Sequence, residues 1–399
     1  MANTMTGACF LLSKDELDHL VKEDFGYFNN DQLRQLKNSG IIISKSLDEK
    51  KLLRYAYQKA KADTDIARII IAFSLSCNMA CSYCFERKKH YIMNDKDIGL
   101  LLQYIIDFVE INRIKGLNIC WFGGEPLLCV KQISSLSNDL IYYCNKTGIN
   151  YTSSIVTNGY LVRKELIEHI REWKIDTVQI TLDGSKEIHN KRRPLVAGGD
   201  SYTEICEGIR LLDKAKVKTR IRVNIDKSNI DEYEIVHDSF REFDYVTCYP
   251  AMVTVEDTQS SEQRSLCFGC NERSMFYDRF QLFESTDYSP GICNCLAEHD
   301  NSFLVDPDGY IYKCLNDIGN PIAAIDHINK RIDGTLSTSK YLGRDPFSED
   351  ECADCKFIPM CYGGCVYEYL RQGTHLCNSV KYSYLTSCRN KIYNTIKDD

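Results

Sequence analysis

"SLSCNMACSYCFE" occupies residues 74–86 and places three cysteines, Cys77, Cys81 and Cys84, within eight positions at the end of an apolar run. A structural zinc site usually takes four ligands, often as two cysteine pairs, and a lone thiol pair indicates redox chemistry. Three clustered thiolates fit neither pattern. They fit an iron–sulfur cluster in which one iron keeps a position open for another molecule.

The stretch opens a series in which short β-rich runs alternate with longer amphipathic patterns, from residue 69 to about residue 250. Such a series predicts an α/β fold with a parallel sheet, either doubly wound or a partial (β/α)6 barrel of the TIM type, and we take the partial barrel as the expected fold. In both architectures ligands gather at the carboxyl ends of the strands. The expected strands are residues 69–75, 117–122, 151–156, 177–182, 219–224 and 245–250, with helices at 97–110 and 202–215 among the segments between them.

Two segments of different character flank this core. Residues 1–68 combine helix-like patterns with the apolar run "GIIIS" (40–44), which predicts a small winged-helix-like module. Residues 251–399 are rich in cysteines and turns and poor in apolar runs, which is typical of a region folded around metal, here a cysteine-rich iron–sulfur domain. The sequence thus predicts three consecutive domains, 1–68, 69–250 and 251–399.

The composition narrows the class of protein. The chain has 399 residues, 44% of them hydrophobic and 26% charged, and no run approaches the roughly 18 apolar residues that a membrane span needs. The net charge of −7 is spread along the chain, and no signal peptide is readable. We therefore expect a cytoplasmic protein without membrane or nucleic-acid partners. In the reducing cytosol, its 20 cysteines are expected to be metal ligands or catalytic thiols rather than disulfides.

A second motif, "WFGGEP" at residues 121–126, follows the second expected strand. Gly123 and Gly124 allow the backbone to approach a ligand closely, and the carboxylate of Glu125 can accept hydrogen bonds from an ammonium group. Alone, the motif could be a tight turn. Its position one strand–helix unit after the cysteines indicates a ligand site that both motifs share.

Cys-x3-Cys-x2-Cys with an aromatic residue before the last cysteine, followed by Gly-Gly-Glu, resembles the radical S-adenosylmethionine (SAM) family. The resemblance implies that Cys77, Cys81 and Cys84 hold three irons of a 4Fe-4S cluster. The fourth iron would bind the amino and carboxylate groups of SAM, and electron transfer would cleave SAM to a 5'-deoxyadenosyl radical. A zinc knuckle with a distant fourth cysteine is the competing interpretation. The residues implied for the SAM site are Tyr83 and, for the methionyl amine, Gly123, Gly124 and Glu125.

A third motif, "ITLDGSKEIHNKRRP" at residues 180–194, ends the fourth expected strand. It resembles the branch of the family that matures proteins and peptides, in which a hydroxyl group and an arginine contact SAM. The resemblance assigns these contacts to Thr181 and Arg193, and a guanidinium suits the carboxylate of SAM as a bidentate partner. The adjacent Arg192 is the alternative ligand, and His189 is expected to brace the loop.

The cysteines near the carboxyl terminus form a fourth pattern, Cys-x13-Gly-x4-Cys followed by Cys-x2-Cys-x5-Cys-x3-Cys. It resembles the SPASM domain, an extension of radical SAM maturases that holds one or two auxiliary 4Fe-4S clusters, so the resemblance implies up to three clusters in all. A zinc ribbon is the competing interpretation. The implied ligands are Cys295, Cys314, Cys365 and an upstream cysteine (Cys293, or else Cys267 or Cys270) for the first auxiliary cluster, and Cys352, Cys355, Cys361 and a downstream cysteine (Cys377 or Cys388) for the second.

The resemblance implies an enzyme that abstracts hydrogen from a peptide or protein. Ribosomally made precursor peptides are the expected substrates, with an intramolecular thioether as the expected product and a carbon–carbon crosslink as the nearer rival. Residues 1–68 are expected either to bind the leader of the precursor or to cap the barrel. A flavodoxin or ferredoxin is the expected external reductant.

Two alternatives remain open. Anaerobic sulfatase maturases oxidise a cysteine or serine to formylglycine and use as base an aspartate directly after the second cysteine of the SPASM pattern. This chain has Leu315 after Cys314, with Asp317 two residues later. An alternative of another class is a non-catalytic iron–sulfur or zinc protein, which predicts four-cysteine sites throughout and no need for Gly-Gly-Glu.

Overall fold

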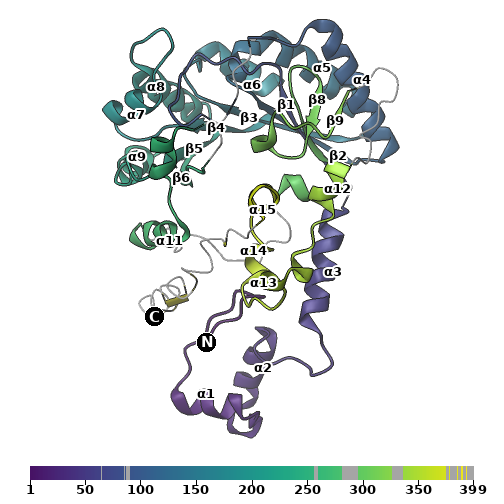
Figure 1. The fold of residues 1–399 in the computed structure, drawn as a ribbon, viewed down its shortest axis with the longest axis vertical. Helices are drawn as coiled ribbons and strands as arrows, with labels where there is room; N and C mark the ends of the chain where they lie inside the picture. Colours follow the sequence, from purple (N-terminus) through teal and green to yellow (C-terminus); the bar gives the residue numbers. More distant parts are fainter. Residues whose placement is uncertain are drawn as a thin grey trace. The chain divides into compact units, whose positions relative to one another are not determined.

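The computed structural model (Figure 1) describes residues 1–63, 65–84, 86, 90–255, 259–280, 295–325, 336–373, 377, 384, 388–389 and 392, with only the backbone for residues 270–271, 274, 277–278, 336–338 and 372. The chain folds into two compact units. The sheet unit comprises Asp63–Phe268 and Leu296–Gly343. The cysteine-rich unit comprises Met1–Ala62, Gly269–Cys295 and Arg344–Asp399. The two ends of the chain therefore belong to one unit, whereas the sequence suggested three consecutive domains.

The sheet unit is built on an open nine-stranded sheet in the order β6-β5-β4-β3-β2-β1-β7-β8-β9. Strands β1 to β6 follow one another in chain order, and each is parallel to its neighbours, which confirms the predicted partial barrel of six strand–helix units. All six expected strands form. Their bounds are β1 Ile66–Ala72, β2 Gly116–Phe122, β3 Asn150–Thr157, β4 Ile175–Thr181, β5 Lys218–Ile225 and β6 Val246–Met252.

Helices connect the parallel strands, and α4, α5 and α6 lie above the strands in Figure 1. In α4 (Asp95–Ile111), Leu101, Ile105 and Val109 recur every four residues and are buried, so one apolar stripe packs inward. The side chain of Asn94 caps this helix by accepting a hydrogen bond from the backbone N–H of Asp97. The other helices that follow the strands are α5 Val130–Thr147, α6 Lys164–Glu172, α7 Lys186–Arg192, α8 Ser201–Lys214 and α9 Glu232–Phe240.

Three short strands from the cysteine-rich half of the sequence extend the sheet. Strand β7 (Ser302–Val305) lies parallel to β1, and β8 (Tyr310–Tyr312) and β9 (Ala323–Ala324) continue antiparallel. The sequence did not indicate these strands. Their consequence for the site is that the segment after β8, the 3-10 helix η4 (Leu315–Asp317), belongs to the sheet unit. The remaining elements of this unit include α10 Ser261–Leu266, η2 Pro126–Cys129, η3 Leu296–Glu298 and α12 Leu336–Leu342.

The N-terminal part of the cysteine-rich unit is helical. It consists of α1 (Lys14–Val21), η1 (Phe25–Tyr27), α2 (Asn30–Asn38) and α3 (Glu49–Lys61). The expected wing is absent from residues 1–62, all of which the structure describes: "GIIIS" forms no strand, and the one β pairing there is an isolated bridge between Ala2 and Cys9. The backbone N–H groups of Ile41 and Ile42 both donate to the carbonyl of Leu36, so this apolar run folds back onto the end of α2.

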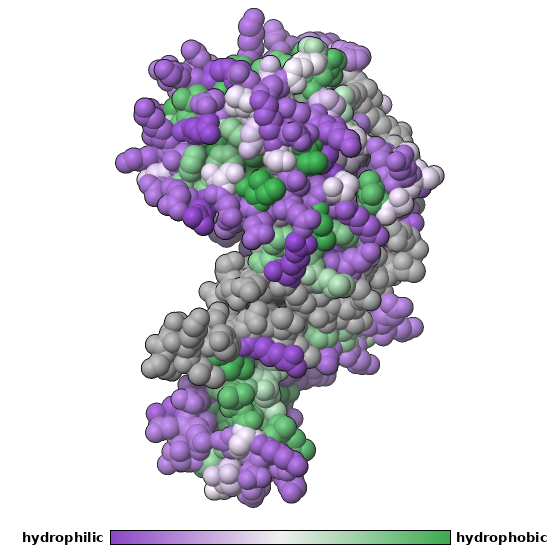
Figure 2. All heavy atoms as spheres, turned by 90° about the vertical axis from the view of Figure 1, so that its left-hand side faces the viewer, coloured by the Kyte–Doolittle hydropathy of each residue, from purple (hydrophilic) through white to green (hydrophobic). Residues whose placement is uncertain are grey.

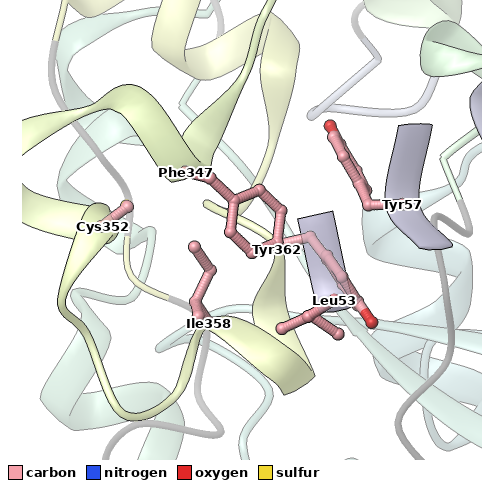
Figure 3. Packing of buried hydrophobic residues seen from close by; sticks show 6 residues of the cluster. All are labelled: Leu53, Tyr57, Phe347, Cys352, Ile358 and Tyr362. Carbon is pink, nitrogen blue, oxygen red and sulfur yellow. The ribbon is translucent and has the colours of Figure 1, made fainter. Parts of the chain in front are cut away.

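The C-terminal part of this unit packs against α3. Leu53 and Tyr57 of α3 share a buried cluster with Phe347, Ile358 and Tyr362 (Figure 3). The rings of Tyr57 and Tyr362 stack with centroids 5.4 Å apart. This packing explains why the first helices and the last cysteines form one unit. The C-terminal elements are short, namely η5 Pro346–Ser348, α13 Asp350–Ala353, α14 Ile358–Cys361 and α15 Val366–Gln372, and α11 Cys270–Arg279 completes the unit.

No helix in the described part of the chain combines the length and the apolar character needed to cross a membrane.

Candidate active site

A cavity of about 300 Å³ lies in the sheet unit at the carboxyl ends of the parallel strands. All three cysteines of the opening motif line it. The strand ends contribute Gly123 after β2, Asn158 after β3, Thr181 at the end of β4, Arg222 and Asn224 from β5, and Met252 from β6. The cavity therefore occupies the edge of the sheet at which the sequence predicts a ligand site.

The loop that carries the cysteines is held by main-chain hydrogen bonds to the segment after α7. The N–H of Ala80 donates to the carbonyl of Pro194 at 2.8 Å, and that of Ser82 donates to the carbonyl of Arg192 at 3.1 Å. Burial raises the pKa of Cys77 above its ordinary value. A nearby metal cation favours a thiolate, so iron would offset this cost of ionising Cys77.

The two glycines of "WFGGEP" allow the loop after β2 to lie against the cysteine loop. The N–H of Gly124 donates to the carbonyl of Ser74, and the N–H of Glu125 donates to the carbonyl of Ser76. A Cβ atom on Gly123 would lie 2.3 Å from the oxygen of Ser74, and one on Gly124 would lie 2.3 Å from that of Ser76. Gly123 also has φ +127°, which side chains disfavour. Both positions thus require glycine, because the two loops lie too close together for a side chain.

Glu125 is fully buried and does not line the cavity. Its Oε1 accepts hydrogen bonds from the N–H of Leu127 and the hydroxyl of Thr157, and its Oε2 accepts one from the N–H of Asn158 at 2.7 Å. Burial raises the pKa of this carboxyl, and the three hydrogen bonds oppose that shift. Glu125 therefore ties the loop after β2 to the end of β3, and Gly123 and Gly124 are the residues of the motif that face the cavity.

The structure separates the two adjacent arginines. Arg192 is paired with buried acids, since its guanidinium lies 2.8 Å from Asp226 and 3.6 Å from Asp183. Arg193 lines the cavity and is also buried, but its guanidinium donates to the hydroxyl of Tyr83 at 2.8 Å and to the sulfur of Met79 at 3.8 Å. Among the residues that the structure describes, no carboxylate lies within ion-pair distance of Arg193.

Burying a cation without an anionic partner costs free energy unless a ligand supplies a negative charge. The Nε atom of Arg193 is buried and has no hydrogen-bond partner among the described residues. Thiolates and a carboxylate are the anions that would satisfy it. The position of Arg193 beside Cys77, Cys81 and Cys84 therefore fits a cavity that takes both an iron–sulfur cluster and the carboxylate of SAM.

Tyr83 joins the cysteine loop to the strand ends. Its hydroxyl donates to Asp183 and accepts a hydrogen bond from Asn224 at 3.0 Å in addition to that from Arg193. Burial raises the pKa of Tyr83 well above its ordinary value, so the phenol stays protonated and remains a donor. Thr181 lies beside this network as a buried residue of the cavity wall.

His189 has the expected role of bracing the loop. It is fully buried, and its Nδ1 accepts a hydrogen bond from the N–H of Asp183. Burial and the nearby charges of Arg193 and Arg192 lower the pKa of His189 to about 3, so the imidazole is neutral. The neutral, enclosed ring accepts a hydrogen bond from the backbone of Asp183. It thereby positions Asp183 for its contact with Tyr83.

Three further cavity residues were not assigned from the sequence. Asn158 stands in the turn "TNG" and donates to Asn78 at 2.7 Å, with the sulfur of Cys77 3.8 Å away. Arg222 donates to the side chain of Asn224 at 2.9 Å. From the sequence alone, a structural role explains Asn158 and Arg222 as well as a role in the site does. Their positions at strand ends are the only indication that they belong to the site. Leu315 reaches the cavity because β7 and β8 join the sheet.

The C-terminal cysteines of the second predicted cluster gather within the cysteine-rich unit. The pKa of Cys352 is raised to about 11, mainly by burial and also by the neighbouring thiols of Cys361 and Cys355. The pKa of Cys361 is raised by burial and by the thiols of Cys355 and Cys377. Cys377 is thus a neighbour of this group, whereas the sulfur of the rival ligand, Cys388, lies 2.9 Å from that of Cys9.

The predicted ligands of the first auxiliary cluster are distributed over both units. Cys295 and Cys365 belong to the cysteine-rich unit and Cys314 to the sheet unit, while Cys293 and the side chain of Cys270 lie outside the described residues. Cys267 is buried, and its sulfur contacts the carbonyl of Gln263.

Within the described part of the chain, no three cysteine, histidine or acidic side chains converge to hold a single metal ion. The thiolates of a 4Fe-4S cluster each bind a different iron, so they need not converge in that way.

Comparison with known proteins agrees with this geometry. Residues 71–239 match the family model of the radical SAM superfamily. This part of the chain is a radical SAM domain, and the protein is an enzyme. The family implies a 4Fe-4S cluster and SAM, which confirms the resemblance that the sequence motifs indicated.

The curated relatives include sulfatase-maturating enzymes and a cyclopropyl synthase. The chain is 23% identical over 331 residues to the cysteine-type anaerobic sulfatase-maturating enzyme of Clostridium perfringens (strain 13 / Type A), covering 75% of this chain and 88% of the relative. It is 20% identical over 397 residues to the radical SAM cyclopropyl synthase TigE of Paramaledivibacter caminithermalis, covering 89% of this chain and 81% of the relative.

Two solved structures share the fold. Native anSMEcpe with bound AdoMet and the Kp18Cys peptide superposes with a TM-score of 0.68 at 20% identity, covering 83% of this chain and 98% of that chain. Streptococcus suis SuiB bound to its precursor peptide SuiA superposes with a TM-score of 0.54 at 14% identity, covering 95% and 94% of the two chains.

Proposed function

We propose that this radical SAM enzyme modifies a ribosomally made precursor peptide and joins a cysteine sulfur of that peptide to one of its carbon atoms. The observation that carries the proposal is the cavity of the sheet unit, which is lined by three cysteines and by a buried arginine that forms no ion pair with any described residue. Peptide substrates are supported by the relatives, since anSMEcpe and SuiB are both known with bound peptides.

Different residues would bind the cluster and SAM. Cys77, Cys81 and Cys84 would hold the cluster, and Arg193 would bind the carboxylate of SAM, with Gly123 and Gly124 close to its amino group. When bound, the cluster supplies the electron that cleaves SAM to a 5'-deoxyadenosyl radical. Thr181 and Tyr83 also line the cavity, and Tyr83 fixes Arg193, because its hydroxyl accepts a hydrogen bond from the guanidinium.

The apolar part of the cavity lining is suited to a radical reaction. Phe122, Met252, Val253 and Leu315 contribute apolar side chains, which help to exclude water. In the proposed reaction a C–H and an S–H bond break and one C–S bond forms. One hydrogen atom goes to the 5'-deoxyadenosyl radical, a proton goes to solvent, and one electron remains for an acceptor.

The cysteine-rich unit is the proposed place of that acceptor. The thiols of Cys361 and Cys355 help to raise the pKa of Cys352, and those of Cys355 and Cys377 help to raise the pKa of Cys361. These neighbours support a second cluster held by the four thiolates. A third cluster with Cys295, Cys314, Cys365 and an upstream cysteine (Cys293, or else Cys267 or Cys270) stays a prediction from the sequence. A zinc ribbon held by Cys352, Cys355, Cys361 and Cys377 is the competing assignment.

Sulfatase maturation is the second candidate, because the curated relatives include both cysteine-type and serine-type sulfatase-maturating enzymes. That reaction needs a base at the position after Cys314. In this chain Leu315 occupies that position and lines the cavity, so an apolar side chain stands where the carboxylate is required. Asp317 instead accepts hydrogen bonds from Tyr341 and Asn320 and does not line the cavity. The thioether product is therefore favoured over formylglycine.

The N-terminal helices are proposed to bind the leader of the precursor. Strand addition is not supported, because no strand forms in residues 1–62, all of which are described. Apolar side chains do lie among polar ones on the surface of these helices, at the bottom of Figure 2. A helical leader with an apolar face would suit them. The exposed residues are Leu11, Leu17, Val21, Phe25, Tyr27, Ile43 and Leu47.

The experiment is co-expression of the enzyme with each small cysteine-containing peptide encoded beside its gene, followed by mass spectrometry. A thioether product has lost two hydrogen atoms and one alkylatable thiol, whereas a carbon–carbon crosslink leaves every thiol free to alkylate. Cys355→Ala is expected to retain 5'-deoxyadenosine formation and to lose the peptide product. Full product from Cys355→Ala would contradict the role of the second cluster.

A further inference from the structure

Cys9 and Cys388 bring the two ends of the chain into contact. Their sulfur atoms are 2.9 Å apart, within the cysteine-rich unit. Cys388 is buried and Cys9 is half-buried. Cys9 lies outside the radical SAM domain and outside the SPASM pattern, and the proposed function uses neither thiol.

The surroundings of this pair fix both partners. Cys388 belongs to a buried cluster with Phe357 and Tyr384, against which Cys9 and Ala2 pack. The same cluster is contacted by Cys355 and Met360, so the pair adjoins the loop that carries the ligands of the second proposed cluster.

The first ten residues fold into a small hairpin on that loop. Ala2 and Cys9 form an antiparallel bridge, and the terminal amino group of Met1 donates to the carbonyl of Phe10 at 2.7 Å. The hydroxyl of Thr4 donates to the carbonyl of Lys356, the residue after Cys355. The position of Cys9 over Cys388 is therefore built by several independent contacts.

The separation of the two sulfurs distinguishes a thiol pair from a metal site. Two thiolates on one tetrahedral metal, at metal–sulfur distances of about 2.3 Å, lie about 3.8 Å apart, and thiolates on different irons of a cluster lie farther apart. Cys9 and Cys388 are closer than either arrangement allows. A shift of less than about 1 Å would bring them to the sulfur–sulfur bond length of about 2.05 Å.

We propose that Cys9 and Cys388 are a dithiol that closes reversibly to a disulfide, and that Cys377 rather than Cys388 completes the second auxiliary cluster. The oxidant is a low-molecular-weight disulfide. The thiolate of Cys9, the more accessible partner, attacks that disulfide and releases one thiol. The thiolate of Cys388 then displaces the second thiol and forms the Cys9–Cys388 bond. Two protein thiols are oxidised and the small disulfide is reduced to two thiols, so both atoms and electrons balance.

The bond would fasten the N-terminal hairpin to the loop of Cys355. This loop also carries Cys361, so oxidation would hold the ligand loop in place by a covalent link instead of by packing alone. The device is independent of SAM cleavage, because neither cysteine lines the cavity of the sheet unit.

The test uses the full chain with its iron reconstituted. The protein is equilibrated without oxygen in buffers of increasing oxidised-to-reduced glutathione ratio, its thiols are alkylated, and the digest is analysed by mass spectrometry. We expect a peptide pair that links residue 9 to residue 388, increasing with the ratio and lost in Cys9→Ser. Cys144→Ser is the control, since this buried thiol of α5 has no proposed role and its loss should leave the pair unchanged.

Iron content tests whether Cys377, and not Cys388, is a ligand of the second auxiliary cluster. Cys9→Ser and Cys388→Ser should each retain the iron of the unmodified protein, whereas Cys377→Ser should lose about four irons per chain, the content of one cluster. A loss of about four irons in Cys388→Ser, or absence of the linked peptides at every glutathione ratio, would overturn the proposal. If Cys388→Ser does not fold, Cys9→Ser with Cys377→Ser decides the same question. None of these results depends on the peptide product by which the proposed function is judged.

Discussion

The two cysteine groups of this chain are supported in different ways. Cys77, Cys81 and Cys84 sit at the edge of a large parallel sheet, in a loop fixed by main-chain hydrogen bonds to Pro194 and to the loop of Glu125. The cysteines at 352–365 lie in or beside helices of four to seven residues around a small apolar cluster. The first site is built by the fold, whereas the second has little packing of its own, so we expect it to depend on the cluster proposed for it.

Removal of iron should therefore affect the two units unequally, and this is the largest effect that we expect. After chelation under reducing conditions, amides of residues 346–372 should exchange hydrogen at rates close to those of an unstructured chain. Amides of β1 to β5 should keep their protection, because these strands are buried by packing alone. Hydrogen exchange followed by mass spectrometry measures both. Equal loss of protection in both units would contradict the distinction.

The fixed geometry of the first site can be broken by a single methyl group. Gly124→Ala would place a Cβ atom 2.3 Å from the backbone oxygen of Ser76 and 2.5 Å from that of Leu75, which cannot move without displacing the cysteine loop. We expect this variant to lose SAM binding and about four of its irons. Gly99→Ala is the matched control, since a Cβ atom there meets nothing within 4 Å in the middle of α4, and it should gain up to about 1 kcal/mol of stability. SAM binding and iron per chain are the measurements.

The neighbouring arginines should respond in opposite ways to the same substitution. Arg193→Met removes a cation that has no ion pair, so the dissociation constant of SAM should rise roughly 10- to 100-fold with little loss of folding stability. Arg192→Met leaves Asp226 and Asp183 buried without their cation, which should lower the free energy of unfolding by about 3–5 kcal/mol. Calorimetric binding and thermal unfolding separate the two. The assignment is reversed if Arg192→Met is the variant that loses SAM affinity while remaining stable.

The smallest expected effect concerns pH. The folded protein holds the pKa of His189 at about 3, against an ordinary value of 6.5, so below pH 6.5 the unfolded chain takes up a proton that the folded chain refuses. The contribution to stability is therefore complete above pH 6.5 and decreases as the pH falls toward 3, by at most about 1.4 kcal/mol per pH unit. The unfolding free energy of His189→Gln should depend less steeply on pH between 6.5 and 5.5 than that of the unmodified protein. Identical slopes would show that the imidazole is not kept neutral by burial.

Much of the sheet could be predicted because its strands carry long β-branched runs separated by amphipathic helices. Strands β7 and β8 could not, since they have only four and three residues, and β7 depends on pairing with β1 and β8 on pairing with β7. The grouping of α3 with the last cysteines was also hidden. It rests on contacts such as Tyr57 with Tyr362, which join residues far apart in the sequence.

The site shows the same limit. Spacing located the three cysteines, the glycines and the arginine pair, because these motifs stand at strand ends. Spacing could not choose between Arg192 and Arg193, since the choice depends on Asp226, which follows a different strand. Nor could it reveal that the carboxylate of Glu125 faces Thr157 and Asn158 instead of the cavity. Such facts depend on which strands become neighbours.

The most direct test of the account is the formation of 5'-deoxyadenosine. The iron-reconstituted protein is reduced with dithionite without oxygen, SAM is added, and the nucleoside is measured by chromatography. We predict product from the unmodified protein and none from the variant with Cys77, Cys81 and Cys84 all changed to Ala, which should keep the irons of its auxiliary clusters. Product from that variant, or none from unmodified protein with its full iron content, would contradict the claim that this cavity cleaves SAM.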